Sequence, residues 1–128
     1  MKSLMRLCGV LQTMSNPSRM RVLEILHRRG ETCVCELEAA LRLSQSNLSF
    51  HLNLLKRDGL VTSKKVGKWV FYSLNERALK ACFGQLTAIF DREQAEKDRS
   101  PDSVYVRCQR EELSRAEILD RTGVATPD

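Results

Sequence analysis

The amino-acid sequence predicts a mainly helical fold that carries one β-hairpin, an α+β arrangement. Apolar residues recur every three to four positions through residues 4–57 and again through 79–90, as they do on helices with one buried face. Between these segments, residues 60–74 change to the two-residue alternation of strands, around a turn at Gly67. The chain has 128 residues, 42% of them hydrophobic, which suits one compact domain with a short appendage.

An Asn-Pro pair separates the first two predicted helices. Residues 4–14 place apolar side chains at helical spacing, and the pattern stops at Asn16 and Pro17. Asparagine is a common N-cap and proline a common first helical residue, so a second helix is predicted over residues 17–29. Gly30 is expected to end it in a left-handed conformation.

Two helices joined by a tight connection follow. Thr32 is predicted to cap a helix over residues 33–42, and Ser44 to cap a helix that continues to Arg57. In the second helix, inward-facing leucines recur every three to four residues and leave short polar side chains on the other face. A connection this short is typical of a helix-turn-helix unit.

The remaining elements complete a winged helix-turn-helix. Strands over 60–66 and 69–74 form the hairpin, or wing, and a last long helix carries the apolar stripe of 79–90. Beyond residue 91 the apolar pattern dissolves. We therefore predict a domain over residues 1–97 and a polar tail, 98–128, that is weakly ordered or docked on the domain.

Positive charge is concentrated in the predicted helix-turn-helix and wing. Residues 42–68 carry six basic side chains and one acidic side chain. Such an excess is typical of proteins that bind a polyanion. The second helix of the predicted unit, which ends at Arg57, would be the recognition helix that reads double-stranded DNA from the major groove. The alternative is a winged helix that binds protein and has a solvated basic face. The expected DNA contacts are Gln45, Ser46, Asn47, Ser49, His51, Lys56, Arg57, Lys64, Lys65 and Lys68.

Several other classes of protein are not expected. No run approaches the roughly 18 apolar residues of a membrane span, and the N-terminal apolar stretch is too short for a secretory signal. We expect a cytoplasmic protein with no membrane partner. Five cysteines, an odd number, argue against a disulfide scaffold. The sequence contains neither a Gly-rich phosphate loop nor a Ser/His/Asp set, so an enzyme is not expected either.

The stretch CVCEL…LSQSNLSFHLNLLKRDGLV…KKVGKWVFYSL resembles the ArsR/SmtB family of metal-responsive repressors. It is most similar to the arsenite-sensing branch, which carries Cys-Val-Cys on the helix before the recognition helix, and the resemblance spans about residues 4–92. It implies a homodimer formed through the first and last helices. It also implies release of operator DNA when As(III) or Sb(III), rather than an organic cofactor, binds cysteine thiolates.

The thiols of Cys33 and Cys35 are the expected centre of such a site. In the first turn of the predicted helix, the dipole and free N–H groups favour thiolate, the form that binds soft ions. Residues at i and i+2 lie about 200° apart on a regular helix. Chelation by both thiols is therefore expected to need distortion of that turn, which would couple binding to the recognition helix.

The third ligand is where the sequence departs from the family. Glu38 stands at the position where the arsenite-sensing pattern supplies a further cysteine. Cys108 in the tail is the preferred replacement. Cys8 is the second choice, because the related Cd/Pb-sensing branch uses an N-terminal cysteine of the partner chain; otherwise Cys8 is expected to fill the core, as is Cys82. The zinc-sensing branch of the family carries a pattern of histidines and carboxylates on its last helix. Neither histidine of this sequence, His27 or His51, falls in that helix, so a zinc site of that kind is not expected.

Two alternatives to an arsenic sensor stay open. The same scaffold with five cysteines also permits a thiol redox or persulfide sensor. A Cd/Pb sensor is the other alternative.

Overall fold

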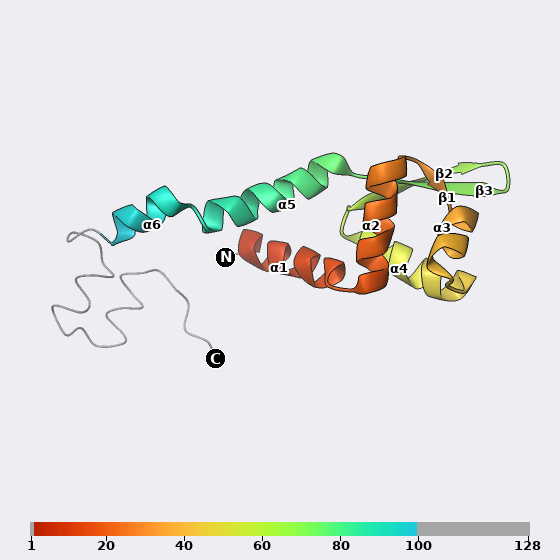
Figure 1. The fold of residues 1–128 in the computed structure, drawn as a ribbon, viewed down its shortest axis with the longest axis horizontal. Helices are drawn as coiled ribbons and strands as arrows, with labels where there is room; N and C mark the ends of the chain where they lie inside the picture. The colour runs from red at the N-terminus through yellow and green to blue at the C-terminus, as the bar shows by residue number, and fades with distance from the viewer. Residues whose placement is uncertain (1, 100–128) are drawn as a thin grey trace. The chain divides into compact units, whose positions relative to one another are not determined.

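The structure is a computed structural model that describes residues 2–99. The chain forms two compact units, Met1–Gln85 and Leu86–Asp128, and the second is described as far as residue 99. The helices and strands of the chain (Figure 1) are α1 (Lys2–Met14), α2 (Pro17–Arg29), β1 (Thr32–Cys33), α3 (Val34–Leu41), α4 (Gln45–Arg57), β2 (Val61–Val66), β3 (Trp69–Leu74), α5 (Glu76–Ile89) and α6 (Arg92–Asp98). The mainly helical fold with a β-hairpin wing is confirmed. The predicted boundary between 97 and 98 stays a prediction.

The first two helices meet at the predicted Asn-Pro junction. The Asn16 side chain accepts a hydrogen bond from the backbone N–H of Arg19 at 3.1 Å, and Pro17 is the first residue of α2. Gly30 ends α2, but with φ 80° and ψ −152° rather than in the predicted left-handed helical conformation. That backbone region is open almost exclusively to glycine, and it turns the chain into a strand instead of a further helix.

The sheet contains a strand that the sequence did not predict. Strand order is β1-β3-β2, and all neighbours are antiparallel. β1 is two residues long and pairs Thr32 with Tyr72 and Cys33 with Phe71. The prediction that Thr32 caps a helix is therefore wrong: Thr32 lies in the strand, and its Oγ1 donates a hydrogen bond to the carbonyl of Gly30 at 2.9 Å. Two residues are too few for an alternation to show.

Helix α3 accordingly begins one residue later than predicted. Cys33 is its N-cap, with extended backbone (φ −70°, ψ 145°), and among the described residues its side chain makes no capping hydrogen bond. Arg42 ends the helix in the left-handed conformation (φ 54°, ψ 40°). Ser44 then caps α4 as predicted, accepting from the backbone N–H of Asn47 at 3.3 Å.

The core of the first unit lies between α2, α3, α4 and the sheet. Leu48 and Leu55 on α4 are fully buried, and so is Leu37 on α3. Cys82 on α5 is 5% exposed, which confirms its predicted place in the core. Because one face of α4 is occupied by leucines, its opposite face must point outward.

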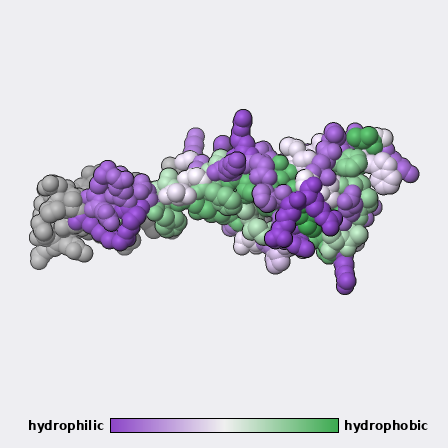
Figure 2. Space-filling model, turned by 45° about the horizontal axis from the view of Figure 1, so that its top comes forward, coloured by the Kyte–Doolittle hydropathy of each residue, from purple (hydrophilic) through white to green (hydrophobic). Residues whose placement is uncertain are grey.

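Large apolar side chains also remain on the surface of the first unit. Leu4 on α1 is 43% exposed, Met20 on α2 is 46% exposed and Phe83 on α5 is 50% exposed. Apolar surface of this kind is visible as green among the purple polar surface in Figure 2. The stripe predicted on the last helix is therefore only partly covered within one chain.

Helix α6 was not predicted. It is seven residues long, and Asp91 caps it by accepting from the backbone N–H of Glu93 at 3.1 Å. Its residues are all exposed or half-exposed, so it has no apolar stripe from which a helix could be predicted. No helix within residues 2–99 combines the length and apolar character needed to cross a membrane.

Candidate nucleic-acid interface and thiol site

The first turns of α4 present short polar side chains to solvent. Gln45, Ser46, Asn47 and Ser49 are all exposed, while Leu48 between them is fully buried. The Ser44 cap satisfies one of the free N–H groups of this helix end, and the helix dipole adds positive potential there. These side chains are exposed as the predicted major-groove contacts must be, and their contact with DNA stays a prediction.

Phe50 is a candidate contact that the sequence analysis missed. It lies on the same face of α4, it is 59% exposed, and its ring meets the His51 ring edge-on with centroids 5.5 Å apart. An exposed phenylalanine beside polar base-reading groups can contact a thymine methyl group. Its position off the leucine face was the signal in the sequence.

His51 faces the body of the domain more than the other predicted contacts do. It is half-buried, and Arg19 Nη1 lies 3.0 Å from its Nδ1. Burial, and secondarily the charge of Arg19, lower the pKa of His51. A neutral ring can accept the arginine N–H, so His51 joins α4 to α2.

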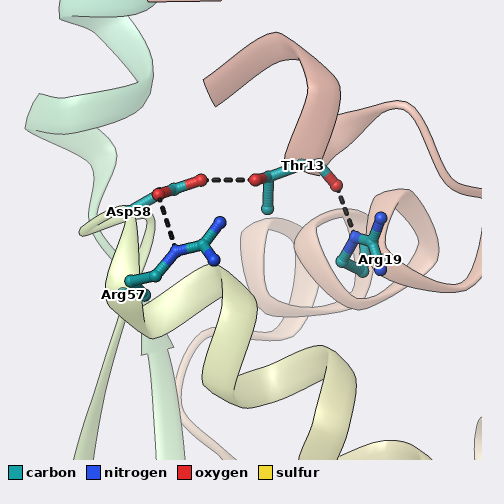
Figure 3. Close-up of polar contacts among 4 residues, drawn as sticks. All are labelled: Thr13, Arg19, Arg57 and Asp58. Atoms are coloured by element: carbon teal, nitrogen blue, oxygen red, sulfur yellow. Dashed lines mark hydrogen bonds and ion pairs between the residues drawn. The ribbon is translucent and has the colours of Figure 1, made fainter. Parts of the chain in front are cut away.

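A chain of polar contacts continues from Arg19 to the end of α4 (Figure 3). Arg19 Nε donates to the carbonyl of Thr13 at 2.5 Å, and Thr13 Oγ1 donates to the carboxylate of Asp58. Asp58 also pairs with Arg57 Nε at 3.3 Å. Thr13 is 5% exposed, so its hydrogen bond is made largely out of water. Residues of α1 and α2 thus hold α4 both in its middle and at its end.

The basic side chains of α4 and the wing are exposed, and several make contacts within the chain. Lys56 Nζ donates to Ser63 Oγ at 2.7 Å, which joins the end of α4 to β2. Lys64 pairs with Glu31 at 3.4 Å, and Lys68 Nζ lies 5.1 Å from the centre of the Trp69 ring. Lys65 is exposed. Exposed pairs of this kind contribute little to stability, so these cations can be redirected to phosphates at small cost.

The two cysteines lie in direct contact. Cys35 Sγ donates to Cys33 Sγ at 2.9 Å, and both are free thiols. Cys33 is 6% exposed, whereas Cys35 is exposed. The expectation that the helix must distort before both sulfurs can face one ion is wrong. Cys33 belongs to the strand and not to the helical turn, so the angular argument for i and i+2 does not apply to it.

The expected preference for thiolate is not found at Cys35. The hydrogen bond to Cys33 raises the pKa of the Cys35 thiol, with desolvation and the electrostatic interaction with Cys33 acting in the same direction. The backbone N–H of Glu36 opposes this and lowers it. At Cys35 the effect of the neighbouring sulfur on the pKa therefore outweighs that of the helix end.

A pocket of about 290 Å³ opens beside the thiol pair. It joins three elements that are separate in sequence: the start of α3, the outward face of α4 and the strand β3. Its lining residues are Cys33, Val34, Cys35, Glu38, Gln45, Ser49, Leu52, Lys68, Trp69, Val70 and Tyr72. Predicted DNA contacts and the predicted thiol ligands thus border the same space.

A complete three-ligand metal site is not formed within residues 2–99, since no group of three His, Cys, Asp or Glu side chains is placed to hold an ion there. Two thiols suit a soft ion, so the donor set present fits part of the predicted site. Glu38 lines the pocket. Cys8 is exposed, so the expectation that it fills the core is wrong for the single chain. Cys108, the preferred third ligand, lies outside the described residues.

The sequence is similar to that of known bacterial regulators. A family model described as bacterial regulatory protein, arsR family, matches residues 16–63. The arsenic resistance transcriptional regulator ArsR1 of Pseudomonas putida is 34% identical over 95 residues, which are 74% of this chain and 73% of that protein. The arsenical resistance operon repressor of Bacillus subtilis (strain 168) is 30% identical over 87 residues, 68% of this chain and 83% of that protein.

The fold is shared with a solved structure. HlyU from Vibrio cholerae N16961 matches with a TM-score of 0.59 at 38% identity, over 70% of this chain and 96% of that chain. HlyU is named a transcriptional activator. These relatives all regulate transcription, which confirms the prediction of a DNA-binding regulator rather than an enzyme.

Proposed function

This chain belongs to the ArsR family of bacterial regulatory proteins, and we propose that it is a cytoplasmic homodimeric repressor that releases operator DNA when As(III) or Sb(III) binds Cys33 and Cys35. The observation that carries the ligand assignment is the 2.9 Å contact between the two sulfur atoms. It puts two soft donors at the start of the helix that precedes the recognition helix. The names of the arsenical-resistance relatives point in the same direction.

Operator binding is assigned to the outward face of α4 and to the wing. The start of α4 reads base edges, and the lysines bind phosphate or reach the minor groove. Phe50 is added to the predicted contacts because of its exposure. The proposed contact residues are Gln45, Ser46, Asn47, Ser49, Phe50, Lys56, Arg57, Lys64, Lys65 and Lys68. His51, which was also predicted from the sequence, is proposed to position α4 through Arg19 instead.

Coupling between the thiols and DNA runs through the sheet and the shared pocket. Cys33 pairs with Phe71 in the wing strand β3, and the pocket beside the thiols is bordered by Gln45 and Ser49 of α4. An ion that draws both sulfurs into its coordination shell therefore acts on the position of the wing and of α4. Release follows if the ion binds more tightly to the arrangement that DNA does not accept.

The homodimer forms through the surfaces of α1 and α5, the helices that the sequence analysis called the first and the last. A groove of about 530 Å³ runs beside α2 and α5 and is lined mainly by apolar side chains, among them Met20, Leu79 and Phe83. Leu4 adds exposed apolar surface on α1. An exposed apolar groove of this kind is typical of a protein–protein interface. Cys108 remains the first choice for a third sulfur and Cys8 the second.

The proposal is tested by operator release. Fluorescence anisotropy with labelled promoter DNA should show tight, strongly salt-dependent binding, and arsenite or antimonite should abolish it. Replacement of both cysteines (Cys33→Ser with Cys35→Ser) should leave DNA binding intact and remove the response. Glu36→Gln, a neutral change at an exposed neighbour, is the matched control and should respond normally. A double-serine protein that releases DNA like the wild type would refute the assignment.

The sulfur contact also favours a second candidate, a thiol redox or persulfide sensor. Sulfur atoms 2.9 Å apart need little movement to form a disulfide. An oxidant would accept the two electrons and two protons; alternatively, a persulfide would transfer its outer sulfur to one thiol, from which the other thiol would displace it as H₂S. Mass spectrometry of the intact chain separates the two functions. A loss of two hydrogens or a gain of sulfur, together with DNA release in the absence of metal, would favour oxidation. Release by Cd(II) or Pb(II) at lower concentrations than arsenite would favour the Cd/Pb alternative instead.

A further inference from the structure

We propose that Phe50 reads the C5-methyl group of one pyrimidine in each half of the operator. The protein then binds DNA with thymine or 5-methylcytosine at this position more tightly than DNA with unmethylated cytosine. The inference rests on the proposed operator binding and names the base feature that α4 recognises. Three observations carry it: the place of Phe50 on α4, the chemistry of its side chain and the contacts that hold its ring.

Phe50 lies on the part of α4 that is proposed to face the bases. It is the sixth residue of the helix, which begins at Gln45. It follows Ser46 by four positions and Asn47 by three, and residues at these spacings share one face of a helix. Ser46 and Asn47 are both exposed. Phe50 therefore belongs to the same outward surface as these polar side chains, within the first two turns of a helix that enters the major groove.

The side chain of Phe50 has no group that can pair with a phosphate or with a polar base edge. It is 59% exposed, so most of it lies outside the packing of the domain. The major groove presents one apolar group, the C5-methyl group of thymine, among hydrogen-bond donors and acceptors that an aromatic ring cannot satisfy. In 5-methylcytosine a methyl group stands at the same ring position. A phenylalanine in the groove is therefore complementary to a C5-methylated pyrimidine.

The ring of Phe50 is held by a sequence of contacts. Its centroid lies 5.5 Å from that of the His51 ring, and the two planes meet at 64° in an edge-to-face arrangement. His51 Nδ1 lies 3.0 Å from Arg19 Nη1. Because arginine can only donate, Nδ1 is the accepting nitrogen and the proton of the neutral ring lies on Nε2. Arg19 in turn donates from Nε to the carbonyl of Thr13 at 2.5 Å.

These contacts make Arg19 a positioning residue for Phe50. Fixing the His51 ring fixes the surface against which the Phe50 ring rests, so less side-chain freedom is lost when that ring meets DNA. Arg19 acts through His51 and does not itself reach the base. Its loss should therefore reduce the preference for the methylated base. That preference is a ratio of two affinities of the same protein, and a general loss of stability does not change it.

Replacement of thymine by uracil removes the methyl group and keeps every hydrogen-bonding group of the base. Duplexes of the protein's own promoter, each with one thymine replaced by deoxyuridine, are titrated with the full-length chain and followed by fluorescence anisotropy. One such replacement in each half of the operator should raise the Kd about fourfold, as expected for one buried methyl group. At that position Phe50→Ala should bind the two duplexes equally. The absence of any position with an effect that Phe50→Ala removes would overturn the inference.

Asn53→Ala is the matched control for Phe50→Ala. Asn53 is exposed on α4 and is not a proposed DNA contact, so its truncation should keep the roughly fourfold effect of uracil. At the same base position, wild-type protein should bind a duplex with 5-methylcytosine about fourfold more tightly than one with cytosine, and Phe50→Ala should bind both equally. Equal affinity of the wild type for these two duplexes would also overturn the inference, because only the methyl group distinguishes them.

Arg19→Lys tests the positioning of the ring. Lysine keeps the charge but lacks the planar group that reaches both His51 and the Thr13 carbonyl, so the uracil effect should fall from about fourfold to below about twofold. Arg21→Lys is the same change at an exposed neighbour on α2 that pairs with Glu24, and it should keep the full effect. Thermal unfolding verifies that both variants fold. An undiminished uracil effect in Arg19→Lys would refute the positioning role.

Failure of the proposed function gives a different result. If the chain does not bind its operator, the unmodified duplex shows no tight, salt-dependent binding, and the inference falls with the repressor. If the chain binds the unmodified duplex tightly but is indifferent to uracil at every thymine, the inference alone is refuted and the repressor stands.

Discussion

The recognition helix α4 and the cysteine-bearing helix α3 are neighbours that are held in different ways. α4 has a side-chain cap at Ser44, three buried leucines and polar contacts from α1 and α2. α3 is eight residues long, buries Leu37, and begins at a cysteine whose side chain, among the described residues, provides no capping hydrogen bond. Helix α4 is thus anchored by its own cap and side chains, whereas the start of α3 is anchored by the pairing of β1 with the distant strand β3.

The largest expected effect concerns the buried face of α4. Leu55 is fully buried, so Leu55→Ala should lower the free energy of unfolding by about 2–5 kcal/mol through lost transfer energy and a residual cavity. Urea denaturation followed by circular dichroism measures this change. Asn53→Ala on the exposed face should cost no more than about 0.5 kcal/mol. Similar losses for the two variants would show that α4 is not anchored by its leucines.

The second-largest loss of stability is expected when the contact between Thr13 and Asp58 is removed. Asp58→Ala leaves the 5%-exposed Thr13 hydroxyl without its acceptor and should cost about 1–3 kcal/mol in unfolding free energy. Arg57→Ala removes only an exposed ion pair and should cost less than about 1 kcal/mol. The comparison is made by urea denaturation of both variants. An Asp58→Ala protein as stable as Arg57→Ala would mean that the polar contacts do not hold the end of α4.

The helix cap gives a smaller, local effect. Ser44→Ala should destabilise the chain by about 1 kcal/mol, because the N–H of Asn47 loses its side-chain acceptor. Ser46→Ala, an exposed serine inside the helix, is the control and should be nearly neutral or slightly stabilising, since alanine has the higher helix propensity. The two melting curves should separate clearly; coinciding curves would show that the cap is not needed.

Replacement of Lys65 tests whether the wing binds phosphate and leaves the contacts that hold α4 in place. Lys65→Ala should leave stability unchanged within about 0.5 kcal/mol, because the side chain is exposed. If Lys65 binds phosphate, the slope of log K against log salt should fall by about 1. Anisotropy titrations over a range of salt concentrations give this slope for the wild type and for Lys65→Ala. An unchanged slope would remove Lys65 from the contact surface.

The smallest expected effect is the pH dependence due to His51. Its pKa is lowered in the folded chain by burial and by Arg19, so the unfolded chain takes up the proton more readily. The contribution of His51 is complete above its unfolded pKa of about 6.5 and is lost as the pH falls through the lower folded value. Urea midpoints between pH 7.5 and 5 should fall more steeply for the wild type than for His51→Gln. Parallel curves would contradict the buried contact with Arg19.

The sequence analysis succeeded where local chemistry decides structure. Asn16 and Ser44 cap α2 and α4 as predicted, and the leucine period of α4 gave the correct buried face. The change of period after Gly59 correctly located the wing. The analysis failed for α6, whose residues form no apolar stripe, and for Cys8, whose apolar neighbours on α1 suggested burial that one chain does not provide.

What the sequence determined by itself is the set of elements with a strong period or a cap, together with the polar, basic face of the DNA-binding unit. What only the tertiary structure decided is the thiol site. Pairing of residues 32–33 with 71–72 makes Cys33 a strand residue and the N-cap of α3, which brings its sulfur against Cys35. The pocket likewise needs α3, α4 and β3 together. Helical periodicity and capping are local and can be derived from neighbouring residues, whereas a two-residue strand exists only because a distant strand offers it hydrogen bonds.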